Sequence, residues 1–431
     1  MKRLAYEKLV EWKISKDRKP LILNGARQVG KTWLLKEFGS REYESVAYIN
    51  CDESGDMKDA FSDFNTDRLI RAFSAISGVA IKPRTTFIIL DEIQEIPIAL
   101  TSLKYFCENA SEYHIAVAGS LLGIGLHQGT GFPVGKVDEI NLYPFSFKEF
   151  LLAIGKDILI ENIEAHRWNE CSALSSTYID ILRQYYYVGG MPAAVKAYVE
   201  ERDIFLVRDI QNQILADYRR DFSKHVPSEI LPKVNMVWDS IPAQLAKENK
   251  KFIYNAVKKG GRAKEFEKAI QWLVDAGLVY KVHRVSKVDK PLKFYEDIDA
   301  FKLFIVDLGL LGALSEVEAK DVLVNNTAFT EYKGAFTEQY VLQELETLKK
   351  KVYYHSKERS ELEIDFIIQK YYVYPIEVKA EENLRAKSLK TIYDGNNSLK
   401  PVRFSMADYR EQEWMVNIPL YLAGGWIEAA E

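Results

Sequence analysis

The segment that most constrains this chain is the loop between two apolar runs near its start. The run at 20–25, PLILNG, predicts a short strand, and the run at 32–39, TWLLKEFG, predicts the first turns of a helix. The pattern G-x-x-x-x-G-K-T lies between them, from Gly25 to Thr32. A glycine-bounded loop at a helix N-terminus directs backbone N–H groups and the helix dipole at one spot. The sequence therefore predicts a phosphate-binding loop.

In such a loop the lysine reaches the outer phosphates of a nucleotide, and the hydroxyl takes a position on Mg²⁺. Lys31 and Thr32 have these places, and Lys31 is also a predicted catalytic residue. We expect ATP and Mg²⁺ as ligands. The predicted nucleotide contacts are Gly25, Ala26, Arg27, Gln28, Val29, Gly30, Lys31, Thr32 and Trp33. The alternative interpretation is an ordinary strand-to-helix turn with a solvated lysine.

Four more strand-like runs follow PLILNG: SVAYINCDE, TTFIILDE, HIAVAGS and KVDEINLYP. Helix-length segments separate the first four of the five runs, which predicts a parallel sheet covered on both faces. TTFIILDE ends in Asp91 and Glu92, and ligands of such sheets bind at the carboxyl ends of strands. We expect Asp91 to hold Mg²⁺ opposite Thr32, and Glu92 to act as the catalytic base. The alternative is two solvated acids.

The fourth run ends at Ser120, for which two interpretations stay open. As a catalytic residue, its hydroxyl would hold the attacking water beside the two acids. It would otherwise be a serine that opens a loop. Lys136 ends the glycine-rich segment that follows, and it would either reach a phosphate or be solvated.

Composition limits the partners and the location. At 431 residues the chain is long enough for roughly three domains of about 150 residues each. Its net charge of −4 means that any contact with nucleic acid must come from a local patch. Three distant cysteines predict reduced thiols in the cytoplasm, without a zinc site. The start of the chain has no signal region, and its longest uncharged stretch contains six glycines, so no membrane association is expected.

The middle of the chain has two patterns. Residues 147–226 read as helical, and residues 231–285 read as three amphipathic helices and a strand, which suggests a winged helix. One segment, 247–264, has seven basic residues against a single acid: Lys247, Lys250, Lys251, Lys258, Lys259, Arg262 and Lys264. Such a segment is suited to contact with DNA phosphates. It would otherwise be a solvated helix face or a protein-contact module.

A second set of acids lies near the end of the chain. ELEIDFII and VYPIEVKA alternate like strands, and a short turn at 370–372 would make them neighbours. Asp365, Glu377 and Lys379 would then converge, while Glu338 projects from the helix predicted for GAFTEQYVLQEL. Two carboxylates and a lysine can hold a magnesium ion and position a water for phosphodiester attack, so Asp365 and Glu377 are predicted metal ligands. The alternative is a cross-strand ion pair.

The segments GARQVGKT, LDEIQ, AGSLL, LYPFSFKEFL and VGGMPAAV together resemble the bacterial AAA+-type ATPases that carry a C-terminal domain of unknown function. The resemblance covers nearly the whole chain. It implies a P-loop ATPase core with strand order 5-1-4-3-2 and a helical lid. Members often have arginine in place of Lys136, and lysine cannot make a bidentate phosphate contact. Candidate arginine fingers are Arg208, Arg219 and Arg220.

The second acid set resembles the PD-(D/E)xK nuclease superfamily. The carried-over catalytic residues are Glu338, Asp365, Glu377 and Lys379, with Ile364 at the place of the motif's proline. The resemblance implies a restriction-endonuclease-like α/β domain.

Together these patterns predict a multidomain α/β protein. The expected domains are a P-loop ATPase core (1–146), a helical lid (147–226), a winged-helix-like domain (227–288) and a PD-(D/E)xK nuclease-like domain (289–431). The predicted function is a DNA-associated ATPase coupled to the nuclease-like domain. The rival is a nucleotide-dependent regulatory switch whose last two domains bind protein or nucleic acid without cleavage. The sequence leaves the oligomeric state open.

Overall fold

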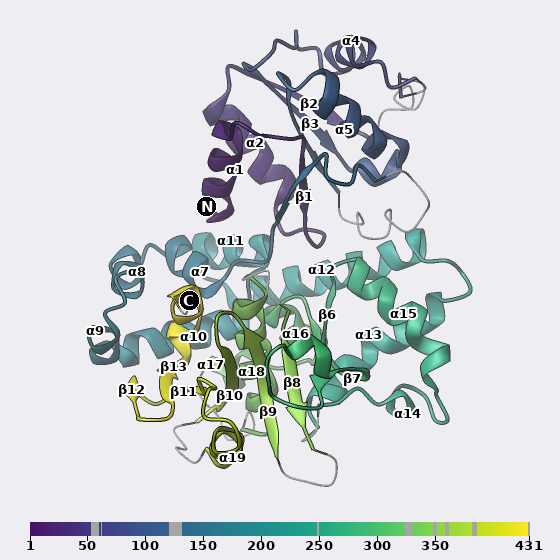
Figure 1. The fold of residues 1–431 in the computed structure, drawn as a ribbon. Helices are drawn as coiled ribbons and strands as arrows, with labels where there is room; N and C mark the ends of the chain where they lie inside the picture. Colours follow the sequence, from purple (N-terminus) through teal and green to yellow (C-terminus); the bar gives the residue numbers. More distant parts are fainter. Residues whose placement is uncertain are drawn as a thin grey trace. The chain divides into compact units, whose positions relative to one another are not determined.

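The structure is a computed structural model of the chain. It describes residues 1–52, 60–61, 63–119, 132–247, 250–323, 330–347, 351–357, 362–381 and 386–429, without the side chains of 330–332. The described chain divides into two compact units. We call Lys2–Tyr143 with Trp272–Leu278 the N-terminal unit, and Pro144–Gln271 with Val279–Glu431 the C-terminal unit (Figure 1).

The N-terminal unit is built on a parallel sheet. In the described residues it has five strands in the order β2-β3-β4-β1-β5. The strands are β1 (Leu21–Asn24), β2 (Ser45–Asn50), β3 (Thr86–Asp91), β4 (His114–Ala118) and β5 (Asp138–Asn141). The predicted order 5-1-4-3-2 is the same order read from the opposite edge, and it is confirmed. This is the α/β fold of P-loop NTPases.

Helices cover both faces of this sheet. They are α1 (Ala5–Ile14), α2 (Lys31–Glu42), α4 (Thr66–Ser77) and α5 (Ile98–Asn109). Successive strand residues point to opposite faces, so Ile88 joins the core formed with α4 and α5. Its neighbour Phe87 instead contacts Trp12 of α1 and Phe38 of α2, with ring centroids 6.1 and 5.4 Å apart. Figure 1 shows the strands between these two helix pairs.

The C-terminal unit contains a mixed sheet. Its described strands number eight, in the order β12-β13-β11-β10-β9-β8-β6-β7. They are β6 (Val279–Val285), β7 (Glu296–Ile305), β8 (Tyr353–Ser356), β9 (Glu363–Gln369), β10 (Val373–Val378), β11 (Val402–Ser405), β12 (Arg410–Glu411) and β13 (Val416–Pro419). Strand β6 pairs antiparallel with β7 and parallel with β8. The domain boundary predicted between residues 288 and 289 therefore falls within the β6–β7 connection of one sheet.

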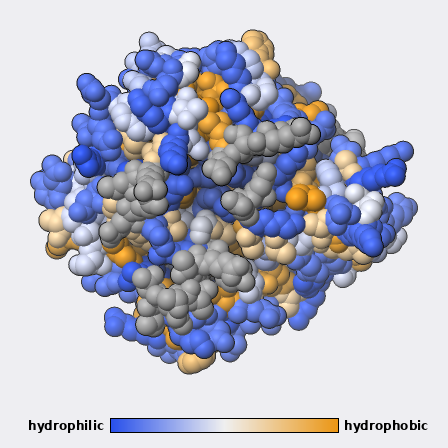
Figure 2. Space-filling model, turned by 90° about the horizontal axis from the view of Figure 1, so that it is seen from below, coloured by the Kyte–Doolittle hydropathy of each residue, from blue (hydrophilic) through white to orange (hydrophobic). Residues whose placement is uncertain are grey.

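Helices make up much of the rest of this unit. The region predicted as helical, 147–226, contains α7 (Phe147–Ala153), α8 (Asp157–Glu164), α9 (Trp168–Ala173), α10 (Ser175–Val188), α11 (Pro192–Glu201) and α12 (Ile204–His225). The later helices are α13 (Leu231–Leu245), α14 (Tyr254–Val257), α15 (Ala263–Asp275, which ends in the N-terminal unit), α16 (Leu308–Leu314), α17 (Ala319–Leu323), α18 (Thr330–Glu346), α19 (Lys387–Gly395) and α20 (Ala423–Ala429). Among the described residues, no helix is long and apolar enough to cross a membrane. The face drawn in Figure 2 is mainly hydrophilic, with hydrophobic residues in separate areas.

Three helices were expected within residues 231–285, and the second of them, KKFIYNAVKK at 250–259, needs correction. Only four of these residues, α14, are helical. The backbone N–H of Phe252 instead donates to the carbonyl of Phe301 in β7 at 2.8 Å, and the two rings stack with centroids 5.4 Å apart. A tertiary pairing with the sheet overrides the local helical pattern here.

The distinctive motif VGGMP is explained by a buried carboxylate. Asp307 is fully buried and accepts a hydrogen bond from the backbone N–H of Gly190 at 2.6 Å. Gly190 in turn accepts from the N–H of Phe145 at 2.7 Å, in the motif PFSF. Gly189 has φ +70°, and a Cβ there would lie 2.4 Å from Asp307 Oδ1, so the position requires glycine. Burial raises the pKa of Asp307 to about 6. These contacts therefore hold the motifs VGGMP and PFSF against each other.

A second buried acid holds the other end of the PFSF motif. Glu344 of α18 accepts a hydrogen bond from the N–H of Phe147 at 2.9 Å, and burial raises the pKa of Glu344 to about 7. The hydroxyl of Tyr185 donates to the carbonyl of Phe145 at 2.5 Å. These contacts join α7, α10 and α18.

Candidate functional site

Two glycines shape the predicted phosphate loop. Gly25 follows β1 with φ +152°, and a Cβ there would lie 2.2 Å from the carbonyl oxygen of Leu142. Gly30 has φ +92° and directly precedes the first residue of α2. Both are conformations that residues with a side chain rarely adopt. The loop therefore turns sharply at each end and leads into the N-terminus of α2, where backbone N–H groups favour an anion.

Lys31 lies at the first position of α2, where the sequence analysis placed it. Its ammonium donates to the carbonyl oxygens of Gly25 at 2.8 Å and Ala26 at 2.7 Å. The residue is 8% exposed, and burial lowers the pKa of Lys31 to about 8, against the opposing charges of Glu92 and Asp91. The loop thus holds a buried cation that has no carboxylate within an ion-pair distance among the described residues.

The structure brings together the two residues predicted to hold magnesium. The hydroxyl of Thr32 donates to Asp91 Oδ2 at 2.7 Å, although 59 positions separate them in the chain. The hydroxyl of Tyr48 donates to the same oxygen at 3.1 Å, and the N–H of Glu92 donates to Oδ1 at 3.1 Å. Asp91 is buried, and these three partners are neutral donors. The hydroxyl and carboxylate are the oxygen ligands that Mg²⁺ prefers.

Glu92 follows Asp91 in a left-handed conformation, with φ 50°. A non-glycine residue in this region is uncommon and often found at functional sites. Gln94 donates from Nε2 to Glu92 Oε2 at 2.5 Å, which orients the carboxylate. The sequence analysis did not identify Gln94 or Tyr48. The position of Gln94, two residues after the acid pair in LDEIQ, was the available signal.

Arg3 is a further residue that the sequence analysis missed. Its guanidinium donates to the carbonyl of Val29 in the loop at 2.9 Å and to that of Tyr143 at 2.6 Å. The side chain is 5% exposed. Arg3 therefore anchors the middle of the phosphate loop to the segment after β5. The carbonyls lie 26 and 140 positions away, so no local pattern indicated the contact.

Other predicted residues differ in their placement. Ser120 lies outside the described residues. The side chain of Trp33 is 46% exposed on α2, while Ala26 and Val29 are buried. Lys136 pairs with Glu108 at 2.9 Å.

The candidate arginine fingers all have partners within the C-terminal unit. Arg208 lies 4.6 Å from the centroid of the Tyr187 ring and donates to the carbonyl of Val317 at 2.8 Å. Arg219 pairs with Asp239, and Arg220 pairs with Asp217, each at 2.5 Å. None of these contacts assigns a role to any of the three.

The second acid set lies in the C-terminal unit on β9, β10 and α18. Strands β9 and β10 form the expected antiparallel hairpin, with Phe366 opposite Ile376. The next position places Asp365 across from Glu377, and Lys379 Nζ lies 3.1 Å from Glu377 Oε1. The carboxylate of Asp365 accepts from the N–H of Val378 at 2.7 Å. The structure therefore brings Glu377 and Lys379 together and places Asp365 on the neighbouring strand.

Glu338 reaches this site from α18, but with partners that the sequence did not indicate. Lys250 Nζ lies 2.5 Å from Glu338 Oε1, and Lys302 Nζ lies 3.8 Å from Oε2. Lys302 also pairs with Glu363 at 2.6 Å. Burial alone would raise the pKa of Glu338, but the charges of the two lysines outweigh it and lower that pKa. Burial and the charge of Glu338 raise the pKa of Asp365.

The fit of a metal ion differs between the two sites. Thr32 and Asp91 offer Mg²⁺ a hydroxyl and a carboxylate that forms no ion pair with a lysine or arginine among the described residues. At the second site, Oε2 of Glu377 is buried and accepts no hydrogen bond in the described part of the chain. A buried oxygen without a hydrogen bond is suited to contact with a cation. Within the described residues, no group of three or more His, Cys, Asp or Glu side chains could hold a metal ion. Asp365 and Glu377 would therefore act as a pair.

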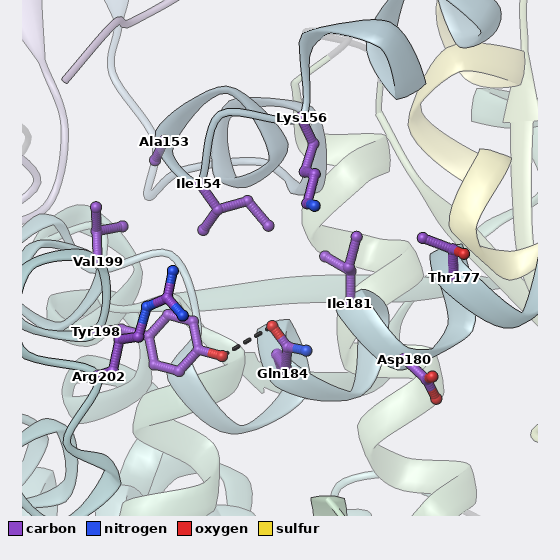
Figure 3. A pocket seen from close by; sticks show the side chains of 10 residues that line it. All are labelled: Ala153, Ile154, Lys156, Thr177, Asp180, Ile181, Gln184, Tyr198, Val199 and Arg202. Atoms are coloured by element: carbon purple, nitrogen blue, oxygen red, sulfur yellow. Dashed lines mark hydrogen bonds between the residues drawn. The ribbon is translucent and has the colours of Figure 1, made fainter.

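A separate pocket of about 570 Å³ lies among α7, α10 and α11 (Figure 3). Figure 3 shows Lys156 and Arg202 at its wall, and Tyr198 donates to Gln184 Oε1 at 2.8 Å. Its lining includes no residue predicted for either site.

Three family models match separate parts of the chain. Residues 17–151 match a model described as an AAA domain. Residues 179–321 match a "Domain of unknown function (DUF8612)", and residues 333–421 match a "Domain of unknown function (DUF4143)". No curated protein matches the chain. The fold, the loop and the first match identify the N-terminal unit as a P-loop NTPase domain of the AAA type.

Solved structures similar to this chain include the Walker-type ATPase PABY2304 of Pyrococcus abyssi, at 15% identity and a TM-score of 0.45, with 73% of this chain and 95% of that chain covered. DnaA of Aquifex aeolicus bound to AMPPCP has 16% identity and a TM-score of 0.29, with 63% and 86% covered. The ORC1 protein of Aeropyrum pernix in complex with DNA has 14% identity and a TM-score of 0.28, with 72% and 90% covered. At these scores the likenesses carry no functional argument.

Proposed function

We propose that the N-terminal unit binds ATP with Mg²⁺ and hydrolyses it. The observation that carries this proposal is the 2.7 Å hydrogen bond from Thr32 to Asp91. It places a hydroxyl and a carboxylate together beside the N-terminus of α2, where the buried ammonium of Lys31 lies. A cation, a set of backbone donors and an oxygen pair for Mg²⁺ are the parts that phosphoryl transfer requires.

The loop residues would bind and orient the phosphates. Backbone N–H groups at the start of α2 point toward an anion, and the helix dipole favours its charge. Phosphate oxygens would replace the carbonyls of Gly25 and Ala26 as acceptors for the ammonium of Lys31. Mg²⁺ would neutralise charge on the phosphates. Thr32 and Asp91 would hold it.

Glu92 would accept the proton of the attacking water. Its position directly after Asp91 places it at the carboxyl end of β3, at the same edge of the sheet as the loop. Gln94 donates to one oxygen of its carboxylate, so the chain fixes the orientation of the base. Proton transfer by a positioned carboxylate contributes about 10²–10⁴ in rate.

Asp91→Asn tests the proposal. We expect the variant to lose Mg²⁺-dependent ATP hydrolysis, because the amide removes the negative charge that holds the ion while it keeps the shape. Asp67→Asn, on the surface helix α4, is the matched control and should hydrolyse ATP at the wild-type rate. Full Mg²⁺-dependent hydrolysis by Asp91→Asn, measured as phosphate release, would contradict the assignment.

We also propose that the C-terminal unit contacts DNA through a winged-helix-like arrangement. Helices α13, α14 and α15 precede the β6–β7 hairpin, and Phe252 pairs with β7 between the first two helices. Four basic residues around the start of α15 are exposed: Lys258, Lys259, Arg262 and Lys264. Lys250, which the sequence analysis counted in the same patch, is instead bound to Glu338.

The salt dependence of DNA binding tests this contact. Each phosphate contact on duplex DNA contributes about −0.9 to the slope of log K against log salt. Replacing the four exposed basic residues by glutamine should flatten the slope by roughly 3–4 units. Absence of DNA affinity in the wild type at low salt would favour the rival function, a nucleotide-dependent switch that binds protein partners.

For the nuclease-like part, we propose a divalent-metal position at Asp365 and Glu377. The buried, unbonded oxygen of Glu377 supports it. Cleavage of DNA at this site would favour the DNA-processing ATPase over the nucleotide-dependent switch. Nicking of plasmid DNA by the full chain with Mg²⁺, lost in Asp365→Ala but retained in Asp91→Asn, would establish cleavage at this site.

A further inference from the structure

Lys250 is the most unusual neighbour of the nuclease-like site. Its side chain is 14% exposed, and its ammonium lies 2.5 Å from a carboxylate that is itself 5% exposed, Glu338. The lysine comes from the connection between α13 and α14, 88 positions before its partner. A buried pair of this kind needs close geometry to offset the cost of removing two charges from water.

The nuclease-like site contains both carboxylates and lysines, whose charges oppose each other. The carboxylates of Glu338, Glu363 and Asp365 face the ammonium groups of Lys250 and Lys302. Both lysines act electrostatically on Asp365 as well as on Glu338. A divalent ion at Asp365 would therefore be repelled by two cations of the chain.

The two lysines differ in how firmly the fold holds them. Lys302 lies inside β7, is fully buried, and has a second partner in Glu363 at 2.6 Å. Lys250 lies outside the strands and helices, and among the described residues its ion pair is the one to Glu338. Withdrawal of Lys250 thus breaks one ion pair without removing a residue from the sheet.

We propose that Lys250 is a built-in competitor of the metal ion at the nuclease-like site. Its ammonium compensates Glu338, and a divalent ion binds at Asp365 and Glu377 with high affinity when Lys250 is withdrawn. The inference rests on the proposed metal position, and it adds a control element to it. Lys250 lies eight positions before Lys258, the first of the four exposed basic residues.

The test is a titration of Mn²⁺ into the full chain without nucleotide, followed by calorimetry. Lys250→Met removes the ammonium and keeps most of the apolar stem. We expect it to bind Mn²⁺ at least tenfold more tightly than the wild type does. Lys251→Met, one position along, is the matched control and should resemble the wild type. Adding Asp365→Asn to Lys250→Met should abolish the gain.

The Tm, measured with and without Mn²⁺, is a second readout in case Lys250→Met is less stable than the wild type. If Lys250→Met lowers the Tm, Mn²⁺ should raise the Tm of the variant more than that of the wild type, because binding to the folded state stabilises it. Equal and tight Mn²⁺ binding by both proteins would overturn the competitor and keep the metal site. No Mn²⁺ binding by either protein would overturn both, and it would leave the proposed ATP hydrolysis untouched.

Discussion

The two acidic sites of the chain use different partners for their carboxylates. Asp91 of the N-terminal unit accepts hydrogen bonds from the hydroxyls of Thr32 and Tyr48, which are neutral. Glu338 of the C-terminal unit instead faces the ammonium groups of Lys250 and Lys302. Neutral donors satisfy a buried carboxylate and leave its charge available to an incoming cation, whereas lysines cancel that charge. The partners thus distinguish a carboxylate whose charge is available to a cation from one whose charge is already compensated.

Protonation follows the same division. Burial lowers the pKa of Lys31 to about 8, so the phosphate loop keeps a cation at neutral pH. At the second site, burial and the neighbouring charge of Glu338 raise the pKa of Asp365, which favours its protonated form. A protonated carboxyl is a poor metal ligand. The first effect keeps a cation for an anionic ligand in the N-terminal unit, and the second disfavours a metal ion in the C-terminal unit.

The largest expected effect comes from Glu92→Gln, which tests whether the N-terminal site is catalytic. The amide keeps a hydrogen-bonding group but accepts no proton, so turnover should fall by about 10²–10⁴. ATP affinity, measured by calorimetry, should stay within a few-fold of the wild type. Glu95→Gln, three positions along, is the control. An unchanged rate of phosphate release in Glu92→Gln would place the base elsewhere.

Lys302→Met tests the charge compensation at the second site. Removing one partner of a buried ion pair leaves an uncompensated carboxylate, which typically costs about 3–5 kcal/mol. We expect a loss of this size in the free energy of unfolding of the C-terminal unit, measured by denaturant titration. Lys379→Met removes a lysine that is 39% exposed and paired with Glu377, and it should cost less than about 1 kcal/mol. Equal effects of the two variants would contradict the comparison.

Lys31→Ala should weaken ATP binding by about 100-fold or more, because hydrogen bonds from a charged donor contribute about 1.5–3 kcal/mol each. Wild-type affinity should itself fall as the pH rises above about 8, since the ammonium of the free protein then loses its proton. Lys8→Ala, on the exposed face of α1, is the control for calorimetry. If the ATP affinity of the wild type does not depend on pH and that of Lys31→Ala is unchanged, the assignment of the phosphate loop is wrong.

Tyr48→Phe should have the smallest effect. It removes one of the neutral donors to Asp91, and such a hydrogen bond contributes about 0.5–1.5 kcal/mol. The affinity for ATP in the presence of Mg²⁺ should change less than tenfold. Tyr6→Phe, which removes a hydrogen bond to Glu42, is the control and should not alter binding. A loss as large as that in Lys31→Ala would mean that Tyr48 contacts the ligand itself.

The sequence predicts the N-terminal site well because its chemistry is local or follows a rule of topology. Gly25 to Thr32 are contiguous, and parallel strands bring their carboxyl ends to one edge, which placed Asp91 opposite Thr32. Arg3 escaped prediction because it binds carbonyls far along the chain. A basic start of a chain gives no indication of such a contact.

The C-terminal unit was harder to predict because its key contacts are distant in sequence. Strand β6 pairs with β8 through His283 and Tyr353, so one sheet includes segments that the sequence assigned to two domains. Lys302 lies in the apolar strand KLFIV, where a lysine usually extends to solvent, but here it is fully buried. Lys250 was counted with a basic surface. Composition does not distinguish an exposed lysine from a paired one.

The most direct test of the comparison is the number of Mn²⁺ ions bound per chain with and without ATP. Glu92→Gln is the protein to use, because it should bind ATP without turnover, and electron paramagnetic resonance separates free from bound Mn²⁺. We expect one tightly bound Mn²⁺ per chain with ATP, lost in the added Asp91→Asn change, and no ion of comparable affinity without ATP. Tight binding that is independent of ATP and abolished by Asp365→Ala would contradict it.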